Sequence, residues 1–140
     1  PRAMARMARF GLISDTQSDA SLLRYEESML HLCKPIRYQE FLWLMDHARL
    51  LITDSGGIQE ETTALGVPCL TVRENTERAV TIHEGTNELI GVDPQRLLEA
   101  VPRVLAEEMP RGDRVPAQWD GQAGQRIIAD LVPWLRARKQ

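Results

Sequence analysis

The sequence predicts one three-layer α/β domain in which helices cover both faces of a mostly parallel sheet. Short apolar runs at residues 49–53 and 67–72 have the composition of strands that are buried on both faces. Amphipathic segments with helical spacing lie between and after these runs. The length of 140 residues suits a single domain with a substantial core.

The first third of the chain is expected to contain short elements. Apolar residues recur at helical spacing in residues 2–10 and 38–47, which predicts two amphipathic helices. Residues 22–29 are interpreted as a further helix with its acidic side chains outward. Residues 30–33 are interpreted as a strand that ends before Pro35.

The rest of the chain predicts alternating strands and helices. After the strand at 49–53, a helix over residues 58–65 ends at Gly66, and the strand at 67–72 follows. A further strand is expected at residues 88–92, followed by a helix over 94–105 that begins at a proline. A last amphipathic helix is expected over residues 122–138.

Composition argues against several classes of function. The chain has 17 Lys and Arg against 20 Asp and Glu, and the net charge of −3 gives no electrostatic reason to expect nucleic acid. No apolar run approaches the roughly 20 residues of a membrane span, and no signal-peptide pattern is present, so we expect a cytoplasmic protein without membrane attachment. Cys33 and Cys69 lack metal-ligand spacing and are expected to be buried free thiols, so no metal site is predicted.

The segment most informative about function is L-L-I-T-D-S-G-G-I-Q-E-E, residues 50–61. It runs from a buried strand through a turn at Ser55, Gly56 and Gly57 into a helix. Paired glycines permit a sharp turn and leave no side chain between a ligand and the peptide N–H groups. Ser55 suits the N-cap of the helix, and its hydroxyl could equally face a phosphate oxygen. The free N–H groups and the helix dipole favour an anion here.

Three charged residues extend this hypothesis. Glu61 follows Gly57 by one helical turn, where a carboxylate could accept hydrogen bonds from both ribose hydroxyls while phosphates lie at the helix N-terminus. Arg73 and Arg78 lie in the loop after the next strand and could clamp a diphosphate or a sugar. This layout fits a nucleoside diphosphate better than a bare anion.

Each of these features also has a purely structural interpretation. Ser-Gly-Gly can be a tight turn with a good cap, and acidic residues early in a helix complement its dipole. The arginines can belong to a solvated loop with internal ion pairs, which contribute little stability. Phe41, Tyr38 and Trp43 share one short helix and are expected in the core, although one of these aromatic rings could stack on a nucleobase.

Four motifs are distinctive as a set: T-D-S-G-G-I-Q-E-E at 53–61, L-G-V-P-C-L-T-V-R at 65–73, N-T-E-R at 75–78 and E-G-T-N at 84–87. Together they closely resemble the C-terminal domain of the non-hydrolysing UDP-N-acetylglucosamine 2-epimerase family. The chain departs from the family pattern at Ala79-Val80, where family members usually have Pro-Glu. This difference removes a carboxylate that the resemblance places near the sugar.

The resemblance implies a fold, a ligand and a reaction. The family is similar to GT-B glycosyltransferases, in which two Rossmann-like domains hold a nucleotide sugar between them. The family reaction inverts carbon 2 of the sugar, by elimination of UDP and its re-addition with a proton on the opposite face, and consumes no cofactor. The resemblance implies that Ser55 and Gly57 contact the diphosphate and that Glu61 contacts the ribose. It also implies that Arg78 contacts phosphate or sugar and that Phe41 lies beside the uracil.

By the same resemblance, residues 1–140 are an incomplete, N-terminally truncated C-terminal UDP-binding domain, because the catalytic carboxylates of the family belong to an N-terminal domain. We therefore expect UDP or a UDP-sugar as ligand, no catalytic residue, and no turnover by this chain alone. The expected protein partner is a second copy of the chain or a complementary N-terminal half. Two alternatives stay open: a hydrolysing epimerase or other GT-B-like nucleotide-sugar enzyme, and a non-catalytic binding or interaction module from a truncated gene.

Overall fold

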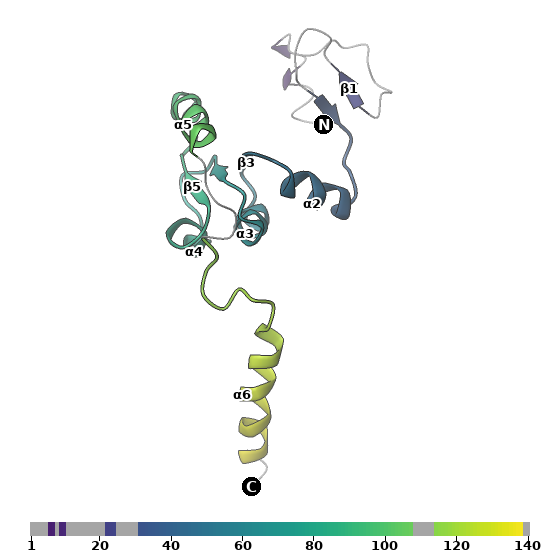
Figure 1. Ribbon diagram of the computed structural model, residues 1–140, viewed down its shortest axis with the longest axis vertical. Coiled ribbons are helices and arrows are strands. Elements are labelled where there is room, and N and C mark those ends of the chain that lie inside the picture. The colour runs from purple at the N-terminus through teal and green to yellow at the C-terminus, as the bar shows by residue number, and fades with distance from the viewer. Residues whose placement is uncertain (1–5, 8, 11–21, 25–30, 108–113, 139–140) are drawn as a thin grey trace. The chain divides into compact units, whose positions relative to one another are not determined.

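The computed structural model describes residues 6–7, 9–10, 22–24, 31–107 and 114–138 (Figure 1). It divides the chain into two compact units, Pro1–Phe41 and Leu42–Gln140. The helix expected over residues 2–10 lies largely outside the described residues, of which residues 6, 7 and 9 are helical.

The first unit contains an antiparallel pair of short strands. Strand β1 (Leu22–Arg24) pairs with β2 (His31–Cys33), with Leu23 opposite Leu32. The strand predicted at 30–33 is confirmed, whereas the helix predicted at 22–29 is wrong at its beginning. The backbone groups of the two strands pair with each other, whereas an isolated helix as short as the predicted one is marginal in water.

Helix α2 (Tyr38–Asp46) confirms the helix predicted in this region, and the division between the two units falls within it. Its one buried residue is Met45. Tyr38 and Trp43 are 61% and 59% exposed, so the expectation that they belong to the core is wrong. The Trp43 ring instead stacks on the ring of His47, with 4.0 Å between the centroids.

The second unit is built on a parallel three-stranded sheet in the order β3 (Leu51–Thr53), β4 (Cys69–Thr71), β5 (Asn87–Leu89). The predicted strands are confirmed, and each is shorter than expected. Strand β4 is buried on both faces, but Ile52 of β3 is 47% exposed, against the prediction. The apolar cluster contains Leu70 of β4 and Ile90, which follows β5, and does not include Ile52 of the outer strand β3.

Helices lie on both faces of this sheet, which confirms the three-layer α/β prediction (Figure 1). Helix α5 (Pro94–Ala106) covers one face, where Ala100 and Val104 pack against the apolar cluster. Helix α3 (Gly56–Leu65) and the short helix α4 (Ala79–His83) contact each other and the sheet on the other side. Helix α4 was not predicted.

The face covered by α3 has a polar core. Gln59, Thr62 and Thr63 of α3 are fully buried, as are Thr71 of β4 and Thr81 of α4. The hydroxyls of Thr62 and Thr63 donate to carbonyls of their own helix, those of Ile58 and Gln59, at 2.8 Å. Buried polar groups are tolerated when they are hydrogen-bonded in this way.

The predicted helix boundaries are largely confirmed. Helix α3 ends at Gly66 in the left-handed conformation, with φ 69°, and begins two residues before the prediction. Helix α5 begins at Pro94, where the N-cap Asp93 accepts a hydrogen bond from the Gln95 N–H at 2.9 Å.

Helix α6 (Ala123–Ala137) is present as expected and has no buried residue. Cys69 is buried, as predicted, but Cys33 is exposed, because it lies in the small first unit. Within the described part of the chain, no helix is both long enough and apolar enough to cross a membrane.

Close packing between α3 and α4 requires glycine at residue 85. A Cβ atom there would lie 2.5 Å from the Thr81 carbonyl oxygen and 2.6 Å from Thr63 Cγ2. We expect Gly85→Ala to destabilise the fold by about 1–3 kcal/mol in urea unfolding, since the backbone must shift to admit the methyl group. Gly124→Ala on α6, where the described residues leave 4 Å of open space, is the control and should not destabilise. Equal stabilities of the two variants would contradict this packing.

Candidate functional site

The candidate site is the N-terminus of α3, which follows β3 through a two-residue turn. Ser55 has the extended conformation of an N-cap, with φ −89° and ψ 126°, and its N–H donates to Thr53 Oγ1 at 3.1 Å. The Ser55 side chain makes no capping hydrogen bond. The first N–H groups of a helix have no partner within it. The structure therefore places Ser55 at the predicted N-cap position while its hydroxyl is not used for capping.

Neither Gly56 nor Gly57 has an unusual backbone conformation, and of the two only Gly56 is closely approached by other described residues. The glycines with positive φ among the described residues are Gly66, Gly91 and Gly121. A Cβ on Gly56 would lie 3.1 Å from Glu77 Oε1 and 3.7 Å from Arg78 Nε, so the loop at 73–78 passes directly over the start of α3. A Cβ on Gly57 would meet only Ser55 Oγ, at 4.0 Å, among the residues that the structure describes.

Both predicted arginines form ion pairs. Arg73 Nη1 lies 3.5 Å from Glu77 Oε2, and Arg78 Nε lies 3.1 Å from Glu60 Oε1, although that N–H is not directed for a hydrogen bond. The Arg73–Glu77 pair lies within the loop, as the purely structural interpretation of the arginines expects, and the Arg78–Glu60 pair joins the loop to α3. All four side chains are at least one third exposed, and such pairs contribute only about 0–1 kcal/mol. These ion pairs by themselves therefore hold the carboxylates only weakly.

Glu77 already places a negative charge at the start of α3. Its pKa is lowered chiefly by a hydrogen bond from its own backbone N–H. Desolvation opposes this effect, and Arg73 and then Arg78 lower the pKa further. This carboxylate lies beside Gly56, where the sequence predicts a phosphate. An anion is thus compatible with this position, and a bound phosphate would have to displace the Glu77 side chain.

The structure brings together most, but not all, of the predicted site residues. Gly56 and Arg78 are adjacent, Ser55 is the N-cap, and Arg73 is connected to them through Glu77. Glu61 is partly buried on α3, one turn beyond Gly57. Phe41 is partly buried in α2 and belongs to the first unit, so it is not among the residues that the structure brings together at α3.

Sequence reasoning gave no role to Gln59, whose side chain connects three parts of the second unit. Gln59 Oε1 accepts hydrogen bonds from Thr76 Oγ1 at 2.6 Å and from Asn87 Nδ2 at 3.3 Å. Asn87 Oδ1 in turn accepts from Thr71 Oγ1 at 2.6 Å. The available signal was the helical spacing of Gln59, Thr62 and Thr63, which puts three polar residues on the face of α3 that packs on the sheet.

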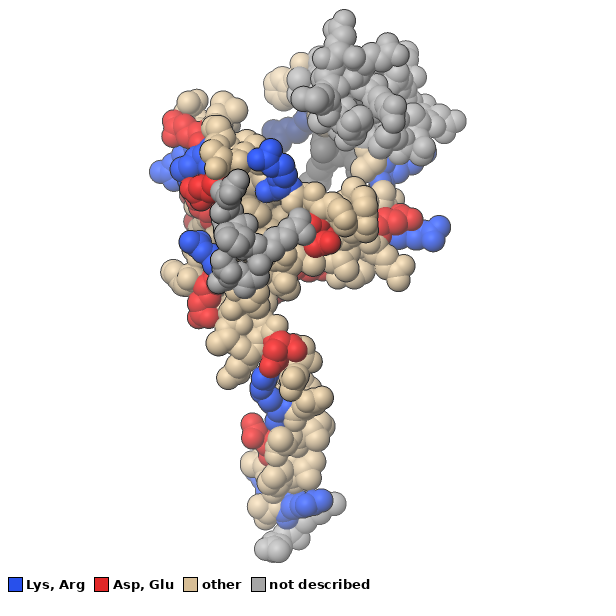
Figure 2. Space-filling model, in the orientation of Figure 1, with Lys and Arg blue, Asp and Glu red and all other residues tan. Residues whose placement is uncertain are grey.

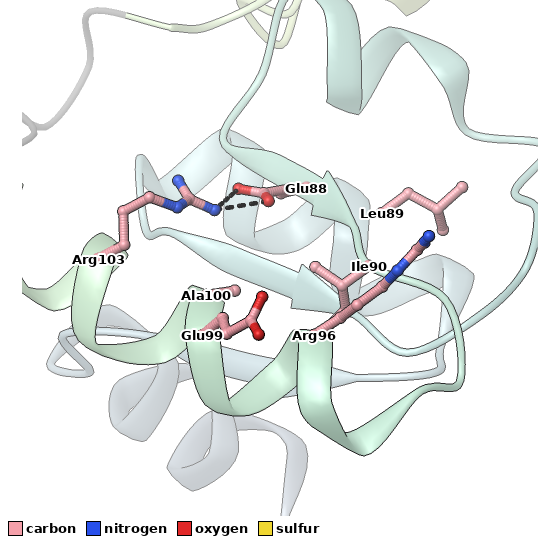
Figure 3. A pocket seen from close by; sticks show the side chains of 7 residues that line it. All are labelled: Glu88, Leu89, Ile90, Arg96, Glu99, Ala100 and Arg103. Carbon is pink, nitrogen blue, oxygen red and sulfur yellow. Dashed lines mark hydrogen bonds and ion pairs between the residues drawn. The ribbon is translucent and has the colours of Figure 1, made fainter.

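A separate cavity of about 440 Å³ lies between β5 and α5 (Figure 3). Arg103 Nη2 donates to both carboxylate oxygens of Glu88, at 2.6 and 2.8 Å, on one side of it. Arg96 extends along the other side, with Glu99 below. Because acidic and basic groups alternate around this opening, it lacks the uniform positive charge that a diphosphate site needs. Figure 2 likewise shows acidic and basic side chains interspersed over the visible face.

Comparison with known proteins decides the family. The family profile described as UDP-N-acetylglucosamine 2-epimerase matches residues 10–132. The chain belongs to the UDP-N-acetylglucosamine 2-epimerase family. It is 41% identical to the UDP-N-acetylglucosamine 2-epimerase of Methanococcus maripaludis over 136 residues, which cover 94% of this chain and 33% of that protein. The enzyme of the same name from Escherichia coli is 46% identical over 105 residues, which are 71% of this chain and 27% of that protein.

A solved structure of the same family has the same fold. The crystal structure of the Methanocaldococcus jannaschii UDP-GlcNAc 2-epimerase in complex with UDP-GlcNAc and UDP superposes with a TM-score of 0.67 at 35% identity. The match covers 94% of this chain and 33% of that one. The predicted relation to a GT-B-type half is therefore confirmed, and the chain spans about one third of the length of these 2-epimerases.

The lowered pKa of Glu77 gives a testable pH dependence. A carboxyl-detected NMR titration should place the Glu77 midpoint below the ordinary range of glutamate. Because the folded-state pKa is the lower one, the associated stabilisation is present above the unfolded-state pKa and is lost as the pH falls through the folded-state pKa. Arg73→Gln should raise the midpoint only in part, since the backbone hydrogen bond is the larger cause. A wild-type midpoint at or above the ordinary value would contradict this electrostatic arrangement.

Proposed function

We propose that residues 1–140 form the C-terminal UDP-binding domain of a UDP-N-acetylglucosamine 2-epimerase and hold the UDP moiety of the substrate. The observation that carries this proposal is the N-terminus of α3, where Gly56 and Gly57 carry no side chain, the Ser55 hydroxyl is not used for capping, and the Arg78 side chain lies beside Gly56. Helix N-termini favour phosphate through unpaired N–H groups and the helix dipole. The M. jannaschii relative was solved with UDP-GlcNAc and UDP, which supports this class of ligand.

The proposed roles follow from the layout of α3. The diphosphate accepts hydrogen bonds from the N–H groups at Gly56 and Gly57 and from the Ser55 hydroxyl, while Arg78 exchanges Glu60 for a phosphate oxygen. Glu61 lies one turn away, about 5–6 Å along the helix, and accepts hydrogen bonds from the ribose hydroxyls. Arg73 supplies a second positive charge once the Glu77 carboxylate has moved away from Gly56, and Phe41 is assigned to the uracil by family resemblance.

The proposed reaction of the whole enzyme is conversion of UDP-N-acetylglucosamine to its manno isomer, in the cytoplasm and for polysaccharide synthesis. In this scheme UDP leaves carbon 1 as a proton leaves carbon 2, and UDP returns as a proton adds on the opposite face. The chain holds the leaving UDP so that it can be re-added, and no cofactor takes part. The acid and base are assigned to the part of the relatives that this chain does not span, which a complementary N-terminal half would supply.

Glu61 provides the direct test of nucleotide binding. In calorimetric titration with UDP, Glu61→Ala should weaken binding by about 10- to 100-fold, because hydrogen bonds to a charged group contribute about 1.5–3 kcal/mol. The matched control is Glu99→Ala, which removes an exposed carboxylate from α5 and should bind UDP like the wild type. A folded wild-type chain that does not bind UDP, or equal binding by both variants, would refute the proposal.

A further inference from the structure

The backbone of Arg78 is held at both of its polar groups by buried or partly buried hydroxyls. The Arg78 N–H donates to Thr76 Oγ1 at 3.1 Å, and the Arg78 carbonyl accepts from Thr81 Oγ1 at 2.7 Å. The Arg78 side chain as a whole is more than one third exposed, although its Nε is buried, and its ion-pair partner Glu60 is exposed to a similar degree. The position of Arg78 is therefore set at its backbone, because an exposed ion pair restrains a long side chain only weakly.

The two hydroxyls are in turn held by buried side-chain amides. Thr76 Oγ1 donates to Gln59 Oε1 at 2.6 Å, and Asn87 Nδ2 donates to Thr81 Oγ1 at 3.1 Å. Gln59 is 0% exposed and Asn87 is 5% exposed, and they contact each other at 3.3 Å. Hydrogen bonds thus run from α3 and β5 to the N–H and to the carbonyl of one loop residue, Arg78.

The hydroxyl of Thr76 is the necessary connection on the α3 side. It donates its one proton to Gln59 and accepts the Arg78 N–H, so both of its hydrogen-bonding functions are directed. Gln59 belongs to α3, whose N-terminus is the proposed phosphate site. The hydrogen bond between Thr76 and Gln59 therefore fixes the backbone of Arg78 relative to that helix. Thr76 lies two residues from Arg78 and acts through it.

We propose that Thr76, held by the buried amide of Gln59, is a positioning residue that places Arg78 over the α3 N-terminus for contact with the diphosphate. The effect on UDP affinity rests on the proposed function, whereas the backbone restraint of Arg78 does not. Thr76 is thereby distinguished from a residue that stabilises the fold in general, because its influence on binding requires Arg78 to be present.

The test compares an isosteric and a conservative variant in the 140-residue chain. Thr76→Val removes the hydroxyl and should weaken UDP binding about tenfold, which corresponds to loss of one well-placed charge-assisted contact. Thr76→Ser retains the hydroxyl and should stay within about twofold of the wild type. Uridine, which has no phosphate, should bind all three proteins equally.

A double-mutant cycle separates positioning from general stability. In the Arg78→Ala background, Thr76→Val should cause no further loss of UDP affinity, because the residue through which it acts is absent. A full additional loss in that background, or wild-type UDP affinity in Thr76→Val itself, would overturn the proposal.

Amide hydrogen exchange provides a measurement that needs no ligand. The Arg78 N–H should exchange about tenfold faster or more in Thr76→Val than in the wild type, and Thr76→Ser should retain its protection. Unchanged exchange in Thr76→Val overturns the proposal whatever the UDP result. Slow wild-type exchange together with absent UDP binding would refute the proposed function and leave the backbone restraint of Arg78 standing.

Discussion

The buried side-chain amide of Gln59 is the constraint on which the candidate site depends. A polar group without access to water is costly unless it is hydrogen-bonded, so the Gln59 oxygen requires the partners that it finds in Thr76 and Asn87. These partners belong to the loop after β4 and to β5, and the helix, the loop and the edge strand are consequently fixed in one arrangement. The sheet thus has two unlike faces: an apolar core beneath α5 gives general stability, and a polar core beneath α3 gives a specific geometry.

This separation between buried and exposed interactions explains how one loop can be both ordered and available for a ligand. The contacts that position the loop are short hydrogen bonds in the interior. The contacts that neutralise its charges are surface ion pairs, Arg73 with Glu77 and Arg78 with Glu60, which are worth little in water. In the proposed function a diphosphate replaces those carboxylates while the interior hydrogen bonds stay in place. The proposed exchange fits the family membership of the chain, because a relative of about three times its length was solved in complex with UDP-GlcNAc and UDP.

Sequence reasoning predicted those features that depend on local pattern. Apolar runs located β3 and β4, the Gly66 stop and the Pro94 start located helix ends, and Ser55 was placed at its N-cap. It failed where tertiary contacts decide. The segment at Leu22–Arg24 became a strand through pairing, and Trp43 is exposed because burial of α2 falls on Met45. The polar network was missed because the partners of Gln59 are 17 and 28 residues away in sequence, and no local pattern reports which distant hydroxyl or amide will meet a buried oxygen.

The central claim is that the N-terminus of α3 is the anion site and that the mixed-charge cavity between β5 and α5 is not. Backbone amide chemical shifts of the isotopically labelled chain, recorded during a titration with UDP, test it most directly. We expect the largest changes at Gly56, Gly57 and Ile58 and smaller ones in the loop that carries Arg78. Changes confined to residues around the cavity, such as Glu88, Arg96 and Arg103, or no changes at saturating UDP, would contradict the account.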